Sequence, residues 1–137
     1  MRPLNLRFGH SYESTSAGIV IPVFLVHGSE SVEVKAKVDT GAAFCLFDRL
    51  HGETLGLDVE AGELQRFRTV TGRFAAFGHE LTLRSYTFEW TSTVYFYEDL
   101  NSHGNFLGRS GWLDRVRMGL VHHDERIYVE PYDEITQ

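Results

Sequence analysis

The sequence has little cysteine, little proline and a deficit of basic charge. Cys45 is the only cysteine among 137 residues, so no disulfide can form within one chain, and we expect a reducing, cytoplasmic compartment. The 13 Lys and Arg residues are outnumbered by 19 Asp and Glu residues, which gives a net charge of −6 at pH 7. A chain this acidic lacks the electrostatic features of proteins that bind nucleic acid or anionic membrane surfaces.

Long hydrophobic runs are also missing. The longest apolar run, Ala17–Val26, is ten residues long and contains Pro22, so it is too short to cross a bilayer as a helix. No apolar stretch follows Arg2, and we therefore expect no secretory signal. The apolar share of 42% and the charged share of 23% are typical of a folded chain, and the length indicates one domain.

Short segments with a period of two run through most of the chain. Residues 31–38 alternate between apolar and charged side chains, which is typical of a half-buried strand. Further strands or short apolar elements are predicted at residues 18–26, 63–70, 73–83, 86–97, 106–108, 116–121 and 127–129. Short helices are predicted at 48–55, with Asp48 as the N-cap, and at 109–114. This pattern predicts an all-β fold, either a barrel or a sandwich.

The sharpest chemical signal is Val38-Asp39-Thr40-Gly41-Ala42, at the end of a predicted strand. A carboxylate on a tight loop suits acid–base chemistry, and glycine gives the loop conformational freedom. On its own the Asp-Thr-Gly tripeptide is weak evidence, because an ordinary β-turn explains it equally well.

Two other segments change that interpretation. Val70, Thr71 and Gly72 lie at the tip of a predicted hairpin, and Leu107, Gly108 and Arg109 follow nearer the C-terminus. In this order the three elements resemble the active-site loop, the flap and the apolar-apolar-Gly-Arg element of retropepsin-like aspartic proteases. The resemblance implies a closed β-barrel with a flap hairpin and one or two short helices. It spans residues 18–130, with an N-terminal arm at 1–17 and a C-terminal tail at 131–137.

The resemblance also implies an enzyme, an aspartic endopeptidase that needs no metal or organic cofactor. Peptide hydrolysis of this kind uses two carboxyl groups that share one proton. Only one Asp-Thr-Gly is present, so the second carboxyl must come from a second chain, and a homodimer with Asp39 of each chain at its two-fold axis is expected. By the same resemblance, Thr40 bonds across the axis, Gly41 and Ala42 line the channel, and the substrate is a peptide or protein.

One departure from the family pattern leaves an alternative open. Retroviral members often carry an aspartate where this chain has Ala43, so Arg109 is expected to lack its usual partner. A catalytically weak or inactive module with the same fold, which binds an extended peptide without cutting it, is therefore the second hypothesis. The quaternary state discriminates the two, because a strict monomer has only one carboxylate.

Other candidate sites have simpler interpretations. Cys45 lies in an apolar stretch and is expected to be buried and unreactive. Adjacent His122 and His123 point apart, so with His103 they are expected to lie in exposed segments and not at a metal site. The remaining aromatic run is expected to form sheet core and not a nucleic-acid platform: Tyr86, Phe88, Trp90, Tyr95, Phe96 and Tyr97.

Overall fold

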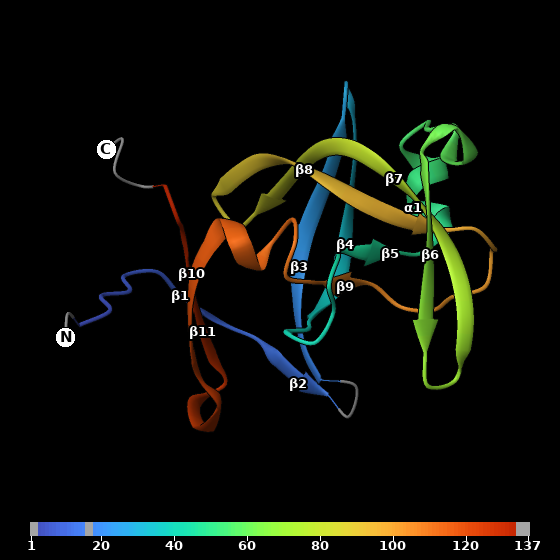
Figure 1. The fold of residues 1–137 in the computed structure, drawn as a ribbon. Coiled ribbons are helices and arrows are strands. Elements are labelled where there is room, and N and C mark those ends of the chain that lie inside the picture. The colour runs from blue at the N-terminus through green and yellow to red at the C-terminus, as the bar shows by residue number, and fades with distance from the viewer. Residues whose placement is uncertain (1–2, 16–17, 134–137) are drawn as a thin grey trace.

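A computed structural model describes residues 3–15 and 18–133 (Figure 1). Parts of the expected arm (1–2 and 16–17) and part of the expected tail (134–137) lie outside the described residues. The strands are β1 (Gly9–Ser11), β2 (Glu13–Thr15), β3 (Gly18–His27), β4 (Glu30–Val38), β5 (Leu46–Phe47), β6 (Glu63–Thr69), β7 (Gly72–Ser85), β8 (Phe88–Tyr97), β9 (Phe106–Leu107), β10 (Val116–Val121) and β11 (Arg126–Pro131). The helices are α1 (Arg49–Thr54) and the short 3₁₀ turns η1 (Val59–Ala61), η2 (Leu113–Arg115) and η3 (His122–Asp124). No helix in the described part of the chain is long and apolar enough to span a membrane.

The all-β prediction is confirmed, and most strands begin and end within two residues of their predicted bounds. The larger sheet has the order β2-β3-β4-β9-β5-β8-β7-β6, and β3 pairs again with β7. The strand pairing therefore runs from β3 around to β7 and back, with β2 and β6 outside this circuit. β5 and β9 contribute only two residues each. The sheet curls round on itself, with β2 and β6 left at its edges, and it is not the closed barrel that was expected.

The core lies inside this curled sheet because the strands alternate as the sequence predicts. Along β3, Ile21, Val23 and Leu25 are buried while Pro22 is exposed. On the edge of β3 away from β4, the described pairings cover residues 18–20 and 24–26 only. Pro22 falls in the gap between them, where its missing N–H group leaves no strand-pairing bond unmade.

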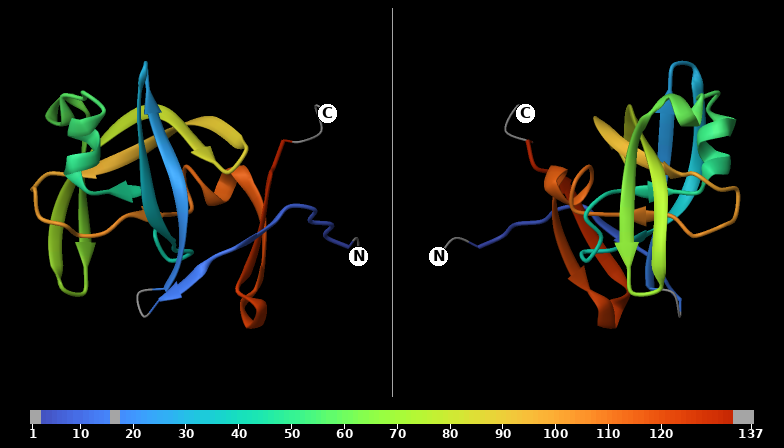
Figure 2. Two further views of the ribbon diagram at one scale, coloured as in Figure 1. Left: turned by 180° about the vertical axis from the view of Figure 1, so that it is seen from behind. Right: turned by 45° about the vertical axis from the view of Figure 1, so that its right-hand side comes forward.

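The expected N-terminal arm is more ordered than its polar sequence indicated. β1 pairs with β11, and β11 pairs with β10, so the two ends of the chain share a three-stranded sheet (Figure 2). β2 instead joins the edge of the larger sheet beside β3. Both strands are only three residues long, and their partners determine them more than any local pattern does.

The helix predicted after Asp48 is confirmed as α1, but the capping role of Asp48 is wrong. Its side chain makes no capping hydrogen bond. It accepts hydrogen bonds from the backbone N–H groups of His103 (2.7 Å) and Gly104 (3.1 Å), and one from the Ser102 hydroxyl (3.1 Å). Asp48 therefore fixes the loop between β8 and β9, which forms one wall of the site described next.

Candidate active site

Asp39 lies just beyond the end of β4, in a loop whose backbone orients its carboxylate. The N–H group of Gly41 donates to Asp39 Oδ1 at 2.9 Å. The N–H group of Ala42 donates to the Asp39 carbonyl at 3.2 Å. The Asp39 side chain is half-buried, while Thr40 and Gly41 are exposed. The loop therefore presents an oriented carboxylate at an accessible surface.

β9 and the segment that follows it hold the Asp39 loop in place through backbone hydrogen bonds. β9 runs parallel to β4, and the Asp39 N–H group donates to the carbonyl of buried Leu107 at 3.0 Å. The Arg109 N–H group donates to the Ala42 carbonyl at 2.9 Å. Between these contacts, a Cβ atom on Gly108 would lie 2.2 Å from the Phe44 carbonyl oxygen. Only glycine allows the two backbones to approach this closely.

The side chain of Arg109 has a partner that sequence reasoning did not foresee. Its Nη1 donates to the Thr40 carbonyl at 2.9 Å. Arg109 does lack the aspartate that is its usual partner in retroviral members, because position 43 is alanine, but it is not without a partner. A backbone carbonyl within the active-site loop takes the place of a carboxylate, and Arg109 holds the loop directly.

The Asp39 loop forms the floor of an open cleft of about 520 Å³ beneath the β6–β7 hairpin. Of the three residues predicted at the flap, Thr71 lines the cleft, Val70 is wholly exposed at the tip, and Gly72 has a φ of +145°. Asp39 is the only carboxylate among the described residues that line the cleft. These residues are Asp39, Gly41, Ala42, Ala43, Leu46, Phe67, Arg68, Thr69, Thr71, Phe74, Tyr97, His103 and Phe106.

A group of aromatic side chains forms the apolar side of the cleft. Phe67 and Phe74 lie opposite each other in the hairpin and stack with ring centroids 4.8 Å apart. Phe67 also contacts Phe44 and Tyr95 edge-on. This aromatic surface was not predicted from the sequence. Phe67 and Phe74 are neighbours only in one register of β6 against β7, and that register depends on where the chain turns.

Another part of the cleft wall carries a histidine that is hydrogen bonded to an aspartate. His103 Nε2 lies 2.6 Å from Asp99 Oδ1, and the His103 ring packs 4.7 Å from that of Tyr97. The hydrogen bond from His103 lowers the pKa of Asp99. Burial, reinforced by the negative charges of Asp48 and Asp99, raises the pKa of Tyr97, so its hydroxyl stays neutral. This wall therefore offers a neutral phenol and a paired imidazole.

The comparisons with known proteins agree with this geometry. No protein-family model matches the chain, and no curated protein matches it significantly. Among solved structures, a retropepsin-like aspartic protease from Rickettsia conorii matches with a TM-score of 0.63 and 18% identity, over 94% of this chain and 96% of that one. EIAV protease, in complex with the inhibitor HBY-793, matches with a TM-score of 0.51 and 16% identity, over 66% of this chain and 80% of that one. The chain has the retropepsin-like fold.

The loop, hairpin and C-terminal element of this retropepsin-like fold all meet at the cleft. Asp39, Gly41 and Ala42 line it directly, and Leu107, Gly108 and Arg109 support it from below. Thr40 is not among the lining residues and faces solvent next to the loop. The predicted residues are therefore brought together, from segments up to about 70 positions apart in the sequence.

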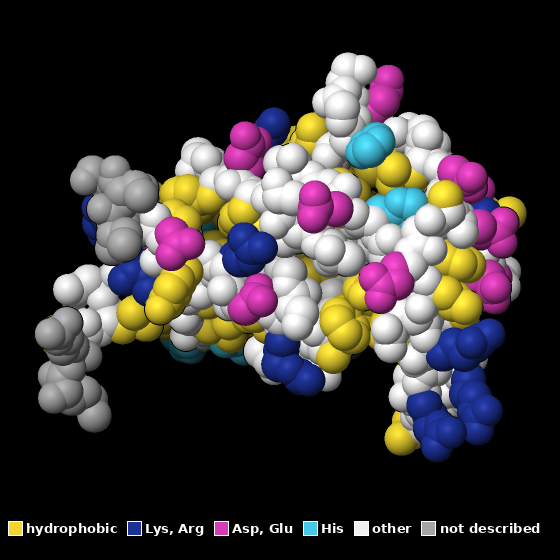
Figure 3. All heavy atoms as spheres, turned by 45° about the horizontal axis from the view of Figure 1, so that its top comes forward, with side chains coloured by type: hydrophobic (Ala, Val, Ile, Leu, Met, Phe, Trp, Pro, Cys, Tyr) yellow, Lys and Arg dark blue, Asp and Glu magenta, His cyan; other side chains and the backbone are white. Residues whose placement is uncertain are grey.

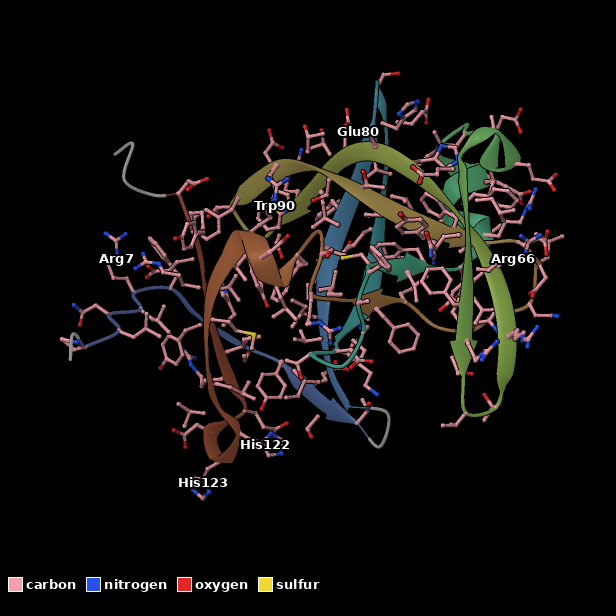
Figure 4. All side chains as sticks on the ribbon, viewed as in Figure 1. Arg7, Arg66, Glu80, Trp90, His122 and His123 are labelled. Atoms are coloured by element: carbon pink, nitrogen blue, oxygen red, sulfur yellow. The ribbon has the colours of Figure 1, made fainter. Side chains whose placement is uncertain are left out.

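Of the other candidate residues, His103 and Tyr97 line the cleft, whereas Cys45, His122 and His123 do not. Cys45 is completely buried, so the expectation of a buried thiol is confirmed, and burial raises the pKa of this thiol to about 12. His122 and His123 lie at the turn between β10 and β11 (Figure 4), where His122 Nδ1 is hydrogen bonded to the Tyr12 hydroxyl. Within the described ranges, no cluster of His, Cys, Asp and Glu is arranged to hold a metal ion.

Proposed function

We propose that the protein is an aspartic endopeptidase that hydrolyses peptide bonds in an extended peptide and is active as a homodimer. The observation that carries the proposal is the position of Asp39. Its carboxylate lies on the floor of a cleft roofed by a hairpin, in a loop fixed by the β9 segment. The retropepsin-like fold supports the same assignment.

The need for a second chain follows from the chemistry. Acid–base hydrolysis requires one group to take a proton from water and another to give a proton to the carbonyl oxygen. Asp39 is the one carboxylate that the described cleft contains. Thr40 and Gly41 beside it are exposed, so the loop is free to meet its own copy across a two-fold axis.

Two Asp39 side chains at such an axis would share one proton, because both cannot ionise at close range. The ionised carboxylate would take a proton from a water molecule, and the water oxygen would add to the peptide carbonyl carbon. The protonated carboxyl would give its proton to the carbonyl oxygen. The tetrahedral intermediate would then collapse. The carboxyl that took the water proton would give it to the departing nitrogen as the C–N bond breaks, and a hydroxyl of the intermediate would return its proton to the other carboxylate. No metal or organic cofactor enters this sequence.

The cleft suits an extended substrate. A peptide between the Asp39 loop and the β6–β7 hairpin would be held by strand-like backbone hydrogen bonds. Its apolar side chains would pack against the aromatic surface around Phe67 and Phe74. The hairpin would serve as a lid that closes over the peptide.

The test is cleavage of a library of quenched fluorescent peptides by the wild type and by Asp39→Asn, from acidic to neutral pH. Asparagine keeps an oxygen that accepts the Gly41 N–H bond, so the variant should fold normally, as checked by circular dichroism. We expect cleavage by the wild type, inhibition by a statine-type peptide and only background activity in the variant. Equal cleavage by both proteins would contradict the proposal. A wild type that binds peptides without cutting them would instead support a peptide-binding module.

A further inference from the structure

Three arginines gather on the β6–β7 hairpin. Arg66 and Arg68 lie on β6, and Arg73 lies on β7 directly opposite Arg68 in the register. All three side chains are exposed, and basic side chains cluster at the free end of the hairpin (Figure 3). Within residues 3–15 and 18–133, none of the three forms an ion pair or a side-chain hydrogen bond.

This arrangement is unfavourable for the hairpin by itself. Like charges directly opposite each other destabilise an antiparallel pair. The cluster is also contrary to the overall charge of the chain, which is −6. Segment 66–73 contains three arginines and no acidic residue. Three unpaired guanidinium groups at one place form a site that a negatively charged group would stabilise.

The arginines also line a hollow that lies beside the candidate active site. Arg66, Arg68 and Arg73 surround a space of about 370 Å³ together with Phe67, Phe74 and Ala75. Arg68, Phe67 and Phe74 also line the cleft that contains Asp39. The two spaces are therefore adjacent on the hairpin. Because successive side chains of a strand point to opposite faces, Arg68 and Arg73 project away from the face of Phe67 and Phe74. The hollow is therefore within reach of a residue that flanks the bound segment, where the peptide passes the edge of the hairpin. Figure 4 shows the position of Arg66 on β6.

We propose that this hollow binds an anionic group of the peptide substrate, either a carboxylate or a phosphate, and so selects acidic peptides for the cleft. The inference rests on the proposed peptidase function and adds a substrate class to it. A peptide is favoured over nucleic acid or a membrane because the basic area is one hairpin on an acidic chain. The hollow also shares lining residues with the cleft, which is lined by aromatic side chains and Asp39.

The experiment compares matched peptides that differ in one or two flanking positions, with Glu, Gln or phosphoserine at each. At low salt and about pH 5.5, where a free glutamate is ionised, we expect kcat/KM to be roughly tenfold higher for the Glu peptide than for the Gln peptide, since each exposed ion pair contributes about two- to fivefold. High salt should reduce this ratio. Below about pH 4 the Glu preference should disappear while the phosphoserine preference remains, because a phosphate keeps a negative charge there.

The variant Arg66→Gln/Arg68→Gln/Arg73→Gln should lose the preference, so that its kcat/KM values for the Glu and Gln peptides become equal. Removing facing like charges does not threaten the hairpin, so this variant should fold. Arg84→Gln is the matched control. Arg84 is an exposed arginine on β7 that is paired with Glu89 and lies outside the hollow. The Arg84→Gln substitution removes one arginine charge outside the hollow and should leave the preference intact.

Peptide binding to Asp39→Asn, measured by fluorescence anisotropy, separates this inference from the proposed function. Tighter binding of the Glu peptide that needs the three arginines supports the hollow, even if no peptide is cut. Equal binding and equal cleavage of the Glu and Gln peptides would overturn the inference while leaving the peptidase intact. A preference that survives in the triple Gln variant would also overturn it. So would arginine-dependent binding of single-stranded RNA or phosphatidylserine vesicles without discrimination between peptides.

Discussion

Gly108→Ala should be among the most damaging single-methyl changes in the protein. The added Cβ atom would lie 2.2 Å from the Phe44 carbonyl oxygen, 2.6 Å from the Phe44 carbonyl carbon and 2.8 Å from the Ala42 carbonyl oxygen. All three atoms belong to the backbone, so no side chain can rotate out of the way. The segment after β9 must move away from the Asp39 loop.

The expected cost has two parts. Overpacking against a rigid neighbour costs about 1–3 kcal/mol. Moving the segment also threatens the hydrogen bonds from the N–H groups of Arg109 to Ala42 and of Ser110 to Ala43, each 2.9 Å long. Each of these contributes about 0.5–1.5 kcal/mol. We expect the free energy of unfolding to fall by about 4 kcal/mol, and peptidase activity to disappear because Asp39 loses its support.

The measurement is urea denaturation followed by tryptophan fluorescence, at one fixed protein concentration because dimerisation would shift the midpoint. Trp112 is completely buried and should report the transition. Gly28→Ala is the control. Its φ of +60° strains an alanine, but no atom lies within 4 Å of the added Cβ, so it should cost about 1–2 kcal/mol. If Gly108→Ala is no more destabilising than Gly28→Ala, the β9 segment does not hold the loop.

Three further predictions concern the hairpin, the thiol and the arginine. Gly72→Val places a β-branched residue at a φ of +145° in open space, which costs about 1–3 kcal/mol of strain. KM for an extended peptide should rise roughly tenfold and Tm should fall by about 3–10 °C; unchanged kinetics would show that the hairpin is not a lid. Because burial raises the pKa of Cys45 to about 12, its thiol is protonated at all lower pH values; a disulfide reagent should react with it only in denaturant, and rapid reaction with the native protein would refute this. Arg109→Met removes the hydrogen bond to the Thr40 carbonyl and should lower kcat. Arg115→Met removes a similar bond to the Thr91 carbonyl outside the cleft and should lower kcat far less. Equal effects of the two substitutions would show that Arg109 does not position the loop.

Local patterns predicted much of the fold. The alternation along β4 and the apolar-polar pattern of β3 fixed which faces are buried, because a strand places successive side chains on opposite sides. β1 and β2 were missed for the converse reason. They are short and polar, and each is a strand only because a partner from another part of the chain lies beside it. Local pattern contains no information about such a partner.

The candidate site was likewise predicted only in part: its backbone elements were found, and its side-chain contacts were not. The Asp39 loop, the hairpin tip and the Gly108 element were found from the order of three motifs. Side-chain partners were not. Asp48 was predicted to cap its own helix but holds a loop more than 50 residues away. Arg109 was predicted to lack its usual aspartate partner, and it bonds instead to a backbone carbonyl, which any residue at position 40 would supply. Neither partner leaves a signal in the sequence.

The central claim is that two chains each supply one Asp39 to a single active site. A mixing experiment tests it most directly: a fixed amount of wild type is equilibrated with increasing amounts of Asp39→Asn, and peptide cleavage is measured. If the site needs Asp39 from both chains, activity per wild-type chain should fall to about half in an equal mixture and continue to fall as the variant is added, because mixed dimers are inactive. Activity that stays constant however much variant is present would contradict the shared site.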